Sequence, residues 1–455
     1  MTTPHAPEAR PPLQGVIVLE LGARVGAAVA GSLLAQMGAT VIAVECRSTG
    51  AFAEPKWRDR TVHAAGKLCI AIDASSPTER ALLVRLASAS DVVIGCSDAD
   101  PLAYASAPFA RSEPKAVSCD LSAFGDSGPF AGWAATDIQI QALSGMLDAT
   151  GLPDSSPLPV TLPLLEYLAG IHAAGAILAA LRLSSAGRQH VSVALYDAAF
   201  SAMTTFLPAA LGGVRKPVNR VGNRHPLASP WNVYRASDGW VLVCAGNDEQ
   251  WQRICALMGE AGSRLAARYP KIGDRVEQPD QVDAGLQAWI GERPIANCIR
   301  EFASAGIPCG PIAPVERFPS EANLDHRAMV RQAIDAVSGH SFFVAGSPLR
   351  MSRTPGVAPG SVSAPDADRA MVLALLHAQE PSSISPDARA SSSDRPLAGI
   401  RVLEIGHYTT APAASRQLAA LGAEVIKLEP PGGEAVRNWP PKLGDRAVFF
   451  SFQNC

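Results

Sequence analysis

The sequence predicts an α/β fold: a large, doubly wound and mostly parallel sheet, joined to a smaller α+β domain. Three observations support this prediction. Apolar segments of strand length alternate with helical ones up to about Leu121, which is typical of a parallel sheet. Near Val214 the pattern changes to closely spaced strands, which indicates antiparallel pairing. The opening pattern then returns after residue 395, which indicates an internal repeat.

The expected elements of the large domain follow one another in a regular order. Apolar runs rich in Val, Ile and Leu predict strands, and runs rich in Ala and Leu predict helices. We expect strands at Val16–Glu20, Val41–Glu45, Asp91–Gly95 and Val117–Leu121, and helices at Ala27–Met37, Ala81–Ala87, Leu162–Arg182 and Leu195–Leu211. This succession indicates a doubly wound, Rossmann-like sheet.

The middle of the chain predicts a separate small domain. Trp231–Arg235 and Trp240–Ala245 flank the turn Ser237–Gly239, which indicates an antiparallel hairpin. We expect both tryptophans, Trp231 and Trp240, in the core. The expected boundaries are 11–210 with 324–360 for the large domain, 223–314 for the small domain, and 361–395 for a linker rich in Ser, Pro, Asp and Ala, with one short helix at Arg369–Ala378.

The clearest signal is the repeat itself. Pro12–Glu45 aligns without a gap on Pro396–Glu429, and roughly half of the positions are identical, which is more than two unrelated βαβ units share. Residues 396–455 therefore predict the opening βαβ unit of a second copy. We expect one complete copy of a fold followed by a truncated second copy.

Composition and missing motifs exclude several function classes. The net charge of −3 gives no electrostatic case for nucleic acid or a membrane as a partner. The nine cysteines are scattered without a CxxC motif, so neither a disulfide framework nor a zinc site is expected. No GxGxxG, GxxxxGK[ST] or GxSxG motif occurs. The polar start is no secretory signal, and the apolar stretch Gly170–Leu181 is short for a membrane span. We expect a cytoplasmic protein.

An ordered series of short motifs carries a more specific indication. The segments are Ser122–Pro129, Gly187–Gln189, Val193–Asp197, Gly222–Pro226 and Ile307–Pro311 in the first copy, and Gly422–Glu429 and Arg437–Trp439 in the second. The series resembles the family III CoA-transferases, which include formyl-CoA, carnitine and bile-acid CoA-transferases. The resemblance covers residues 12–348 and 396–455.

The resemblance implies transfer of CoA between an acyl-CoA and a small carboxylic acid. In the family an Asp attacks the acyl-CoA thioester, which gives a mixed anhydride and then an enzyme–CoA thioester. Glu166 occupies the matching position, four residues before Gly170. Its carboxylate is one methylene further from the backbone, and misplacement of about 1 Å can cost ~100-fold in rate. Alternatively, Glu166 is an ordinary acidic residue of a helix N-terminus.

The resemblance implies CoA or acyl-CoA as substrate, with no permanently bound cofactor and no metal. The candidate CoA-binding residues are Arg24, Val25, Arg47, Gly222, Asn223, Arg224 and His225. Several positions depart from the family: Cys46 and Tyr104 replace Arg, Cys96-Ser97 replaces Asn-Phe, and Gly26–Ala28 replaces Ala-Gly-Pro at the first helix. Since neither Cys nor Tyr replaces a guanidinium as a phosphate ligand, we expect the CoA pocket of the first copy to lack part of the family's phosphate contacts.

These departures leave more than one function open. The first copy is either a working transferase or a catalytically degenerate half that completes the site of a second copy. The family pairs two copies, so we expect an interlocked homodimer or an intramolecular pseudo-dimer. A coupled lyase step, as in the CoA-transferase/lyase acting on dimethylsulfoniopropionate, also fits the fold. An acyl-CoA racemase is weaker, because Thr136 stands where those enzymes use a His.

Overall fold

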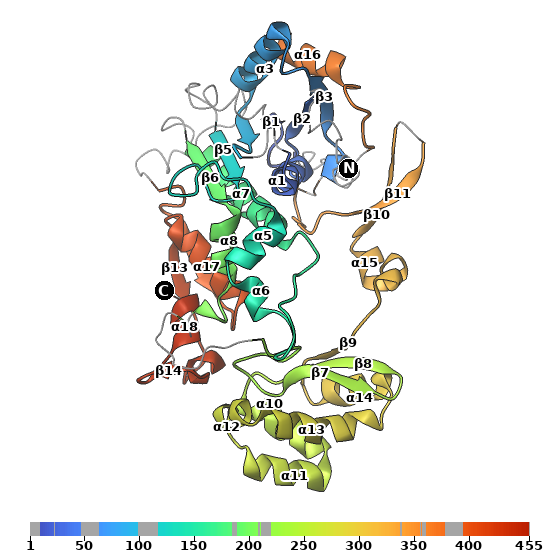
Figure 1. The fold of residues 1–455 in the computed structure, drawn as a ribbon, viewed down its shortest axis with the longest axis vertical. Coiled ribbons are helices and arrows are strands. Elements are labelled where there is room, and N and C mark those ends of the chain that lie inside the picture. The colour runs from blue at the N-terminus through green and yellow to red at the C-terminus, as the bar shows by residue number, and fades with distance from the viewer. Residues whose placement is uncertain are drawn as a thin grey trace, which may run out of the picture. The chain divides into compact units, whose positions relative to one another are not determined.

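The structure is a computed structural model of the whole chain. It describes residues 10–21, 23–46, 63–98, 117–183, 189–207, 210, 220–336, 339–354, 356, 361–377 and 395–454. Two compact units can be distinguished, and each is described by itself. Unit 1 contains residues 1–141, 161–199 and 316–398, and unit 2 contains residues 142–160, 200–315 and 399–455 (Figure 1).

Unit 1 is built on a six-stranded sheet with the strand order β3-β2-β1-β4-β5-β6. All five strand pairs are parallel, as the alternation of strands and helices predicts. The strands are β1 (Ile17–Leu21), β2 (Thr40–Cys46), β3 (Leu68–Ile72), β4 (Val92–Gly95), β5 (Val117–Ser122) and β6 (His190–Ala194). The order reverses between β1 and β4, and in sheets of this kind ligands bind at that point, beyond the carboxyl ends of the strands.

Helices cover both faces of this sheet. Helices α3 (Pro77–Ala89) and α16 (Arg369–His377) pack on the face that carries Leu19 and Ile42. Helices α1 (Val25–Gln36) and α7 (Leu164–Arg182) pack against each other, α1 next to β1 and β2, and α7 next to β5 and β6. The two-sided cover explains why β1 and β2 are apolar nearly throughout instead of alternating with polar residues.

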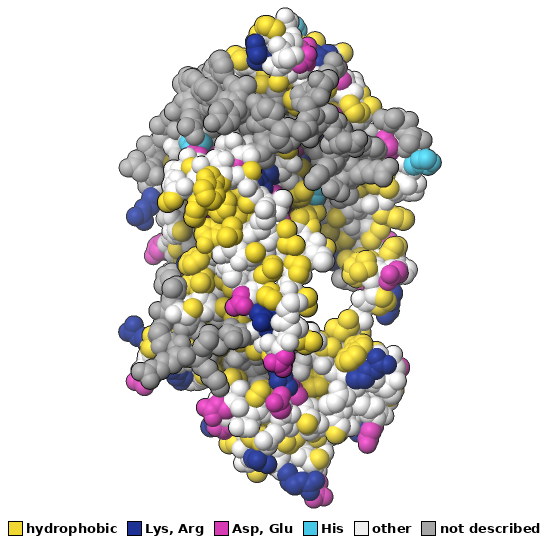
Figure 2. All heavy atoms as spheres, in the orientation of Figure 1, with side chains coloured by type: hydrophobic (Ala, Val, Ile, Leu, Met, Phe, Trp, Pro, Cys, Tyr) yellow, Lys and Arg dark blue, Asp and Glu magenta, His cyan; other side chains and the backbone are white. Residues whose placement is uncertain are grey.

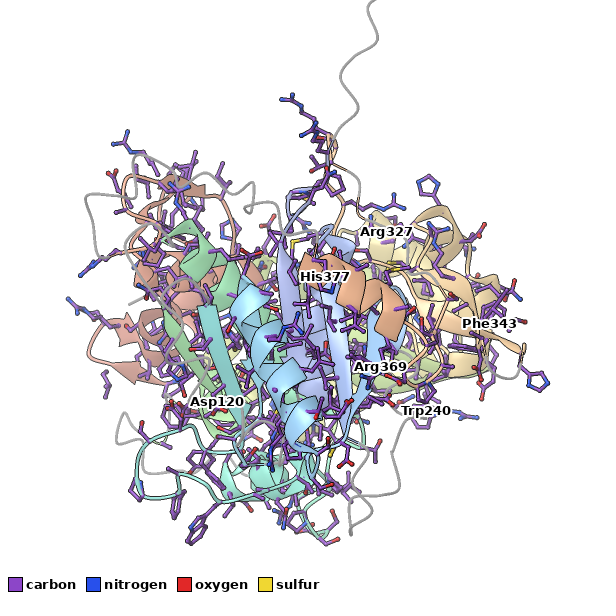
Figure 3. The ribbon with its side chains drawn as sticks, turned by 90° about the horizontal axis from the view of Figure 1, so that it is seen from above. Asp120, Trp240, Arg327, Phe343, Arg369 and His377 are labelled. Carbon is purple, nitrogen blue, oxygen red and sulfur yellow. The ribbon has the colours of Figure 1, made fainter. Side chains whose placement is uncertain are left out.

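Helix α16 lies within the segment predicted as a linker, so part of that segment belongs to the core. Val372 is fully buried against α3 and the sheet. Arg369, at the start of α16 (Figure 3), donates to the carbonyl of Ala71 at 2.6 Å and pairs with Glu79 at 2.9 Å. Upstream, the side chain of Asp368 accepts the Cys69 amide at 2.8 Å. The segment therefore satisfies donors along the free edge of β3.

The remaining helices and strands of unit 1, including those at its boundaries with unit 2 in the chain, are short. They are α5 (Asp137–Leu143), α8 (Leu195–Ala202), the 3-10 helix η2 (Val315–Ser320), α15 (Ala322–His326) and the antiparallel hairpin of β10 (Val330–Ile334) and β11 (Ser341–Ala345). α7 is the one described helix long and apolar enough to cross a membrane, and more than half of it is buried inside the protein. The long apolar sequence of α7 thus reflects packing in the protein interior.

Unit 2 contains the predicted small domain. Strands β7 (Trp231–Ala236) and β8 (Gly239–Cys244) form the expected hairpin, and β9 (Cys309–Pro311) pairs with β8. Helices α10 (Asp248–Leu257), α11 (Gly259–Arg268), α12 (Ile272–Glu277), α13 (Pro279–Gly291) and α14 (Ile295–Ser304) follow this hairpin in the chain, and unit 2 also contains α6 (Met146–Ala149). The core of this domain gathers around Trp251 and Phe302, both fully buried.

The second repeat begins as the first one does, in the order β12 (Arg401–Glu404), α17 (Thr410–Ala420) and β13 (Glu424–Lys427). Strands β12 and β13 pair in parallel. The rest of the repeat consists of the 3-10 helix η3 (Ala435–Asn438), β14 (Lys442–Leu443), β15 (Arg446–Ala447) and α18 (Val448–Gln453). Val436, Trp439 and Phe449 pack against Leu227 and Ile272 of the small domain.

The two repeats bury the same glutamate in different ways. Glu20 on β1 pairs with Lys67 at 2.6 Å, and a methyl group on Gly31 of α1 would lie 2.0 Å from its Oε2. The matching Glu404 on β12 pairs with Lys427 at 2.5 Å and accepts a short hydrogen bond from the hydroxyl of Ser415, which stands where the first repeat has Gly31. In both repeats a lysine thus neutralises the buried carboxylate, but Lys67 lies just before β3, whereas Lys427 lies on β13.

The sheet faces of the two repeats differ in exposure. Leu19 and Leu21 of the first repeat are fully buried, whereas their counterparts Leu403 and Ile405 are 59% and 69% exposed. Hydrophobic side chains are also visible on the surface in Figure 2. In unit 1 the exposed ones include Phe130, Trp133, Ile138, Tyr167 and Ile171. Exposed apolar surface of this kind is typical of sites that contact another polypeptide.

Candidate active site

Glu166 lies in the first turn of α7, and only 7% of it is exposed. The N-terminus of this helix is fixed by Asp137 of α5, whose Oδ2 accepts the amides of Leu165 at 2.8 Å and Glu166 at 3.0 Å. A carboxylate that satisfies two free amides of a helix N-terminus stabilises the helix start. The backbone of Glu166 is therefore held in one place.

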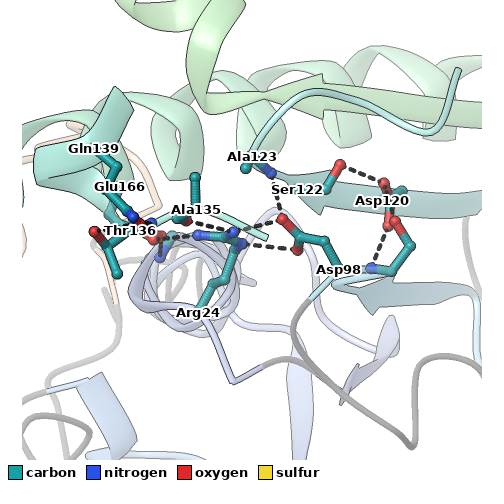
Figure 4. Close-up of polar contacts among 11 residues, drawn as sticks. Arg24, Asp98, Asp120, Ser122, Ala123, Ala135, Thr136, Gln139 and Glu166 are labelled. Atoms are coloured by element: carbon teal, nitrogen blue, oxygen red, sulfur yellow. Dashed lines mark hydrogen bonds and ion pairs between the residues drawn. The ribbon is translucent and has the colours of Figure 1, made fainter. Parts of the chain in front are cut away.

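Both carboxylate oxygens of Glu166 accept a hydrogen bond (Figure 4). Oε1 accepts from Nη1 of Arg24 at 2.8 Å, and Oε2 accepts from the amide of Gly26 at 2.9 Å. Gly26 lies in the first turn of α1, where amides lack partners within the helix. The Glu166 side chain thus joins the starts of α7 and α1 and has one defined orientation.

Arg24 is the partner of two buried carboxylates. Its Nε and Nη2 donate to the two oxygens of Asp98 at 3.1 and 2.6 Å, and Nη2 also donates to the carbonyl of Ala135 at 2.9 Å. Burial alone would lower the pKa of Arg24, but Asp98 and Glu166 outweigh it and raise that pKa above its ordinary value. Arg24 is therefore a permanent cation in this site.

Asp98 itself follows β4 and is held by the residue that follows β5. Its Oδ2 accepts the amide of Ala123, which follows β5, at 2.7 Å. Next to it, Asp120 of β5 accepts the amide of Ser97 at 2.8 Å and the hydroxyl of Ser122 at 2.8 Å (Figure 4). Both acidic residues lie at the carboxyl ends of the parallel strands, where α/β proteins of this type place their functional groups.

The departures from the family pattern are only partly described by the structure. Cys46 ends β2, and Cys96 follows β4 and is fully buried. Burial raises the pKa of the Cys96 thiol well above its ordinary value, so the thiol stays neutral. Two further residues that the sequence singled out, Arg47 and Tyr104, lie outside the described residues.

The four candidate residues of the small domain form one loop before β7. Gly222 has a positive φ of 67°, which favours glycine, and Asn223 is exposed. Arg224 pairs with Asp283 at 2.6 Å and with Asp280 at 2.7 Å. Burial alone would lower the pKa of Arg224, but the two carboxylates raise it. This arginine is therefore tied to its own domain.

His225, the fourth residue of this loop, is a neutral histidine. Burial lowers its pKa to about 4, and its Nδ1 accepts the amide of Leu227 at 3.1 Å. The proton of the neutral ring is therefore on Nε2. The centroid of the ring lies 4.8 Å from that of Trp231, with the two planes tilted by 31°, and 5.3 Å from that of Trp439, which belongs to the second repeat.

Trp439 anchors the second repeat on the small domain. Its indole N–H donates to the carbonyl of Gly246 at 2.9 Å, and its ring also contacts Tyr408 and Phe449. Two residues before Trp439, Arg437 forms a bidentate ion pair with Glu429, in which Nη2 lies 2.6 Å from Oε1 and Nε lies 2.7 Å from Oε2. The hydrogen bonds from Arg437 lower the pKa of Glu429 to about 2. The second repeat thus brings the aromatic ring of Trp439 next to His225 of the loop 222–225.

The structure divides the predicted site residues between the two units. Glu166, Arg24 and Val25 lie together in unit 1, with Val25 opening α1, and Gly222–His225 lie in unit 2. The sequence did not single out Asp98 or Gly26 as partners of Glu166. It also missed the hydrogen bond of 2.8 Å between the Tyr167 hydroxyl and His63. The available signal for Asp98 was an acidic residue three positions after a buried strand, β4, which ends at Gly95.

Comparison with known proteins identifies the family. The sequence profile described as CoA-transferase family III matches residues 13–369 and 397–454, which include both repeats. The succinate–glutarate CoA-transferase of Agrobacterium fabrum is 30% identical over 77% of this chain and 92% of its own length. The acetyl-CoA:oxalate CoA-transferase of Acetobacter aceti is 27% identical over 77% of this chain and 91% of its own.

A solved structure leads to the same assignment. The crystal structure of a CaiB/BaiF family protein from Brucella suis is similar with a TM-score of 0.66 and 25% sequence identity, over 81% of this chain and 100% of that one. The parallel sheet, the profile match and the sequence relatives thus agree. The chain belongs to the CoA-transferase family III.

Proposed function

We propose that this chain transfers CoA between an acyl-CoA and a dicarboxylic acid through the carboxylate of Glu166. The observation that carries the proposal is the environment of that carboxylate. It is buried at the carboxyl end of a parallel sheet and oriented by one donor on each oxygen, from Arg24 and Gly26. A carboxylate held in this way is poised for nucleophilic attack in one direction, which lowers the entropic cost of the reaction.

Two steps would move CoA onto the protein. One Glu166 oxygen attacks the carbonyl carbon of the acyl-CoA, the carbon–sulfur bond breaks, and the thiolate leaves with its electron pair. The thiolate then attacks Cδ of Glu166 in the mixed anhydride and releases the acyl group as a carboxylate. The acceptor acid repeats these steps in reverse order and departs as the new acyl-CoA.

The relatives support a dicarboxylic acid as acceptor. The enzyme from Agrobacterium fabrum is named for succinate and glutarate, and the enzyme from Acetobacter aceti is named for oxalate. The second carboxylate of such an acid requires a cationic or amide-rich partner. CoA is a substrate in this proposal, with no permanent cofactor. Since all the described cysteines are free thiols, we also propose a cytoplasmic location.

A covalent trace tests the proposal. After incubation with succinyl-CoA, intact-mass measurement should show a CoA adduct that hydroxylamine removes. Glu166→Gln keeps the shape but lacks the nucleophile and should abolish the adduct. Glu166→Asp restores the shorter side chain of the family and should still form it. Failure of the unmodified protein to form an adduct or to transfer CoA to glutarate would refute the proposal.

A second candidate function has its own supporting observation. The second repeat packs through Trp439 next to the loop 222–225 of the small domain. This contact supports a degenerate first copy that supplies its small domain to a site of a second copy, in a pseudo-dimer within one chain. The exposed Leu403 and Ile405 support pairing with further sheet elements. If the first copy is degenerate, calorimetry should detect no CoA binding by this chain. Light scattering would measure the mass in solution and so distinguish a single-chain pseudo-dimer from an interlocked homodimer of two chains.

Racemization and a coupled lyase step have less support. Thr136 precedes α5 and binds the side chain of Gln139 at 2.8 Å through its amide, so no histidine takes up the racemase role there. Among the described residues, none beside Glu166 favours a lyase step over plain transfer. We therefore propose transfer alone.

A further inference from the structure

Arg24 has committed most of its donors inside the protein. An arginine carries five N–H donors, and Asp98, Ala135 and Glu166 accept from all three of its nitrogens. Only 8% of the residue is exposed. These four hydrogen bonds leave one N–H of Nη1, so a phosphate of CoA could form a bidentate contact with this guanidinium only by displacing one of two buried carboxylates, and either displacement would leave a buried charge without a partner. The geometry therefore argues against Arg24 as a phosphate ligand.

The charge balance points to a different role. The two carboxylates of Asp98 and Glu166 share one guanidinium, and Asp98 takes it with two parallel bonds. When Glu166 becomes an anhydride or a thioester, its negative charge disappears. Arg24 still keeps Asp98 as a full ionic partner in that state. Acylation of Glu166 thus leaves no unpaired cation in the protein interior.

We infer that Arg24 belongs to the acyl-transfer machinery as a donor to the reacting carboxyl group of Glu166, with Asp98 as its positioning residue. The inference rests on the proposed function. When the thiolate attacks Cδ of Glu166, the oxygen that stays on Cδ takes up negative charge in the tetrahedral intermediate. Arg24 already donates to Oε1 and Gly26 to Oε2, so either oxygen has a donor. Such donors stabilise the developing oxyanion.

Asp98 makes this donor rigid. Its side chain is 1% exposed and accepts the amide of Ala123 at 2.7 Å in addition to its two bonds from Arg24. The carbonyl of Ala135 supports the guanidinium from another segment. In the second repeat the position of Arg24 is occupied by Tyr408, which offers neither the charge nor the fork of donors. The arrangement of Arg24 and Asp98 is therefore specific to the first repeat.

Three variants test the inference in the full-length chain: Arg24→Met, Arg24→Lys and Asp98→Asn. We measure the CoA dissociation constant by calorimetry, and the rate of CoA adduct formation at saturating succinyl-CoA by intact mass. Loss of one oxyanion donor typically costs ~100- to 1000-fold in rate. We expect a loss of this size for Arg24→Met, a smaller loss for Arg24→Lys, and an intermediate loss for Asp98→Asn. The CoA dissociation constant should change less than about twofold.

Controls distinguish a loss of activity from a failure to fold. Arg80→Gln removes an exposed arginine of α3 whose Nη1 bonds the carbonyl of Ala74, and it should match the unmodified protein in both measurements. Circular dichroism identifies any variant that does not fold, and Arg24→Lys then remains as the charge-conserving test. A tenfold or greater loss of CoA affinity with an unchanged saturating rate would assign Arg24 to the phosphates and overturn the inference. An inactive unmodified protein would refute the proposed function and, with it, the inference.

Discussion

Gly170 of α7 lies directly against the carbonyl of Gly26 of α1: a methyl group on Gly170 would be 2.5 Å from that oxygen. The same Gly26 donates its amide to Glu166, so the crossing of two helices and the orientation of the candidate nucleophile depend on one residue. A side chain at either glycine would force the helices apart.

Gly170→Ala should therefore destabilise unit 1. The added methyl group would overlap with the backbone of Gly26 and with Val29, and overpacking of this kind costs about 1–3 kcal/mol. Gly175→Ala on the same helix is the matched control, because its methyl group would meet nothing within 4 Å. It should be neutral or stabilise by up to ~1 kcal/mol through helix propensity. Urea unfolding of the two variants measures the difference, and equal midpoints would contradict the prediction.

Trp439 should be the main anchor of the second repeat. Trp439→Ala removes a buried ring and leaves the carbonyl of Gly246 without its donor, and changes of this size cost about 3–5 kcal/mol. The loss should appear as faster hydrogen exchange of residues 399–454, with little change in unit 1. Trp240→Ala is the control, since Trp240 is 46% exposed. Equal exchange in both variants would show that other contacts hold the second repeat.

His225 should make unit 2 sensitive to acid. Burial depresses its folded pKa to about 4, below the ordinary value of 6.5. Because the folded protein keeps this ring neutral, the ring's contribution to the free energy of unfolding is complete above the unfolded pKa of 6.5. That contribution is lost as the pH falls from 6.5 toward 4. His225→Gln should flatten this loss. His63 in unit 1 has the same folded pKa of about 4, so hydrogen exchange resolved by unit is the required measurement. An unchanged acid profile of unit 2 in His225→Gln would exclude this origin.

Asp368 should protect the edge of the large sheet. Asp368→Ala removes the acceptor of the Cys69 amide, and an unsatisfied donor of this kind costs about 1–3 kcal/mol. The amide of Cys69 on β3 should then exchange faster. Asp280→Ala, at an exposed carboxylate of the small domain, should leave that amide unchanged. Slow exchange of Cys69 in Asp368→Ala would mean that water or a neighbour replaces the carboxylate.

Much of the fold could be predicted because hydrophobic patterning and turn signals are local. Strand Val16–Glu20 was displaced by one residue from the observed β1, and the hairpin around Ser237 lies where it was expected. The burial of Trp240 was predicted wrongly. Its ring lies on the exposed side of β8, next to Arg235 at 5.1 Å. In a half-buried strand, the alternation of side chains between the two faces does not by itself identify the face that packs on the core.

The site was harder to predict because its contacts join distant segments. Arg24 and Glu166 were both selected as site residues, but their ion pair spans 142 positions of the chain. Asp98 and Asp368 were not selected, since an acidic residue in a polar segment has no periodicity. Their importance follows from the buried donors that they face: the guanidinium of Arg24 in one case and the free edge of β3 in the other.

The two buried glutamates also limit which residues can be exchanged between the two repeats. In the first repeat Glu20 requires Gly31, because a β-carbon there would lie 2.0 Å from its carboxylate, while in the second Glu404 uses the hydroxyl of Ser415 at the same place. A serine in place of Gly31 would therefore force the Glu20 carboxylate and its partner Lys67 to shift. Helices α1 and α17 are therefore not interchangeable, because each carries at this position the residue that fits the buried glutamate of its own repeat.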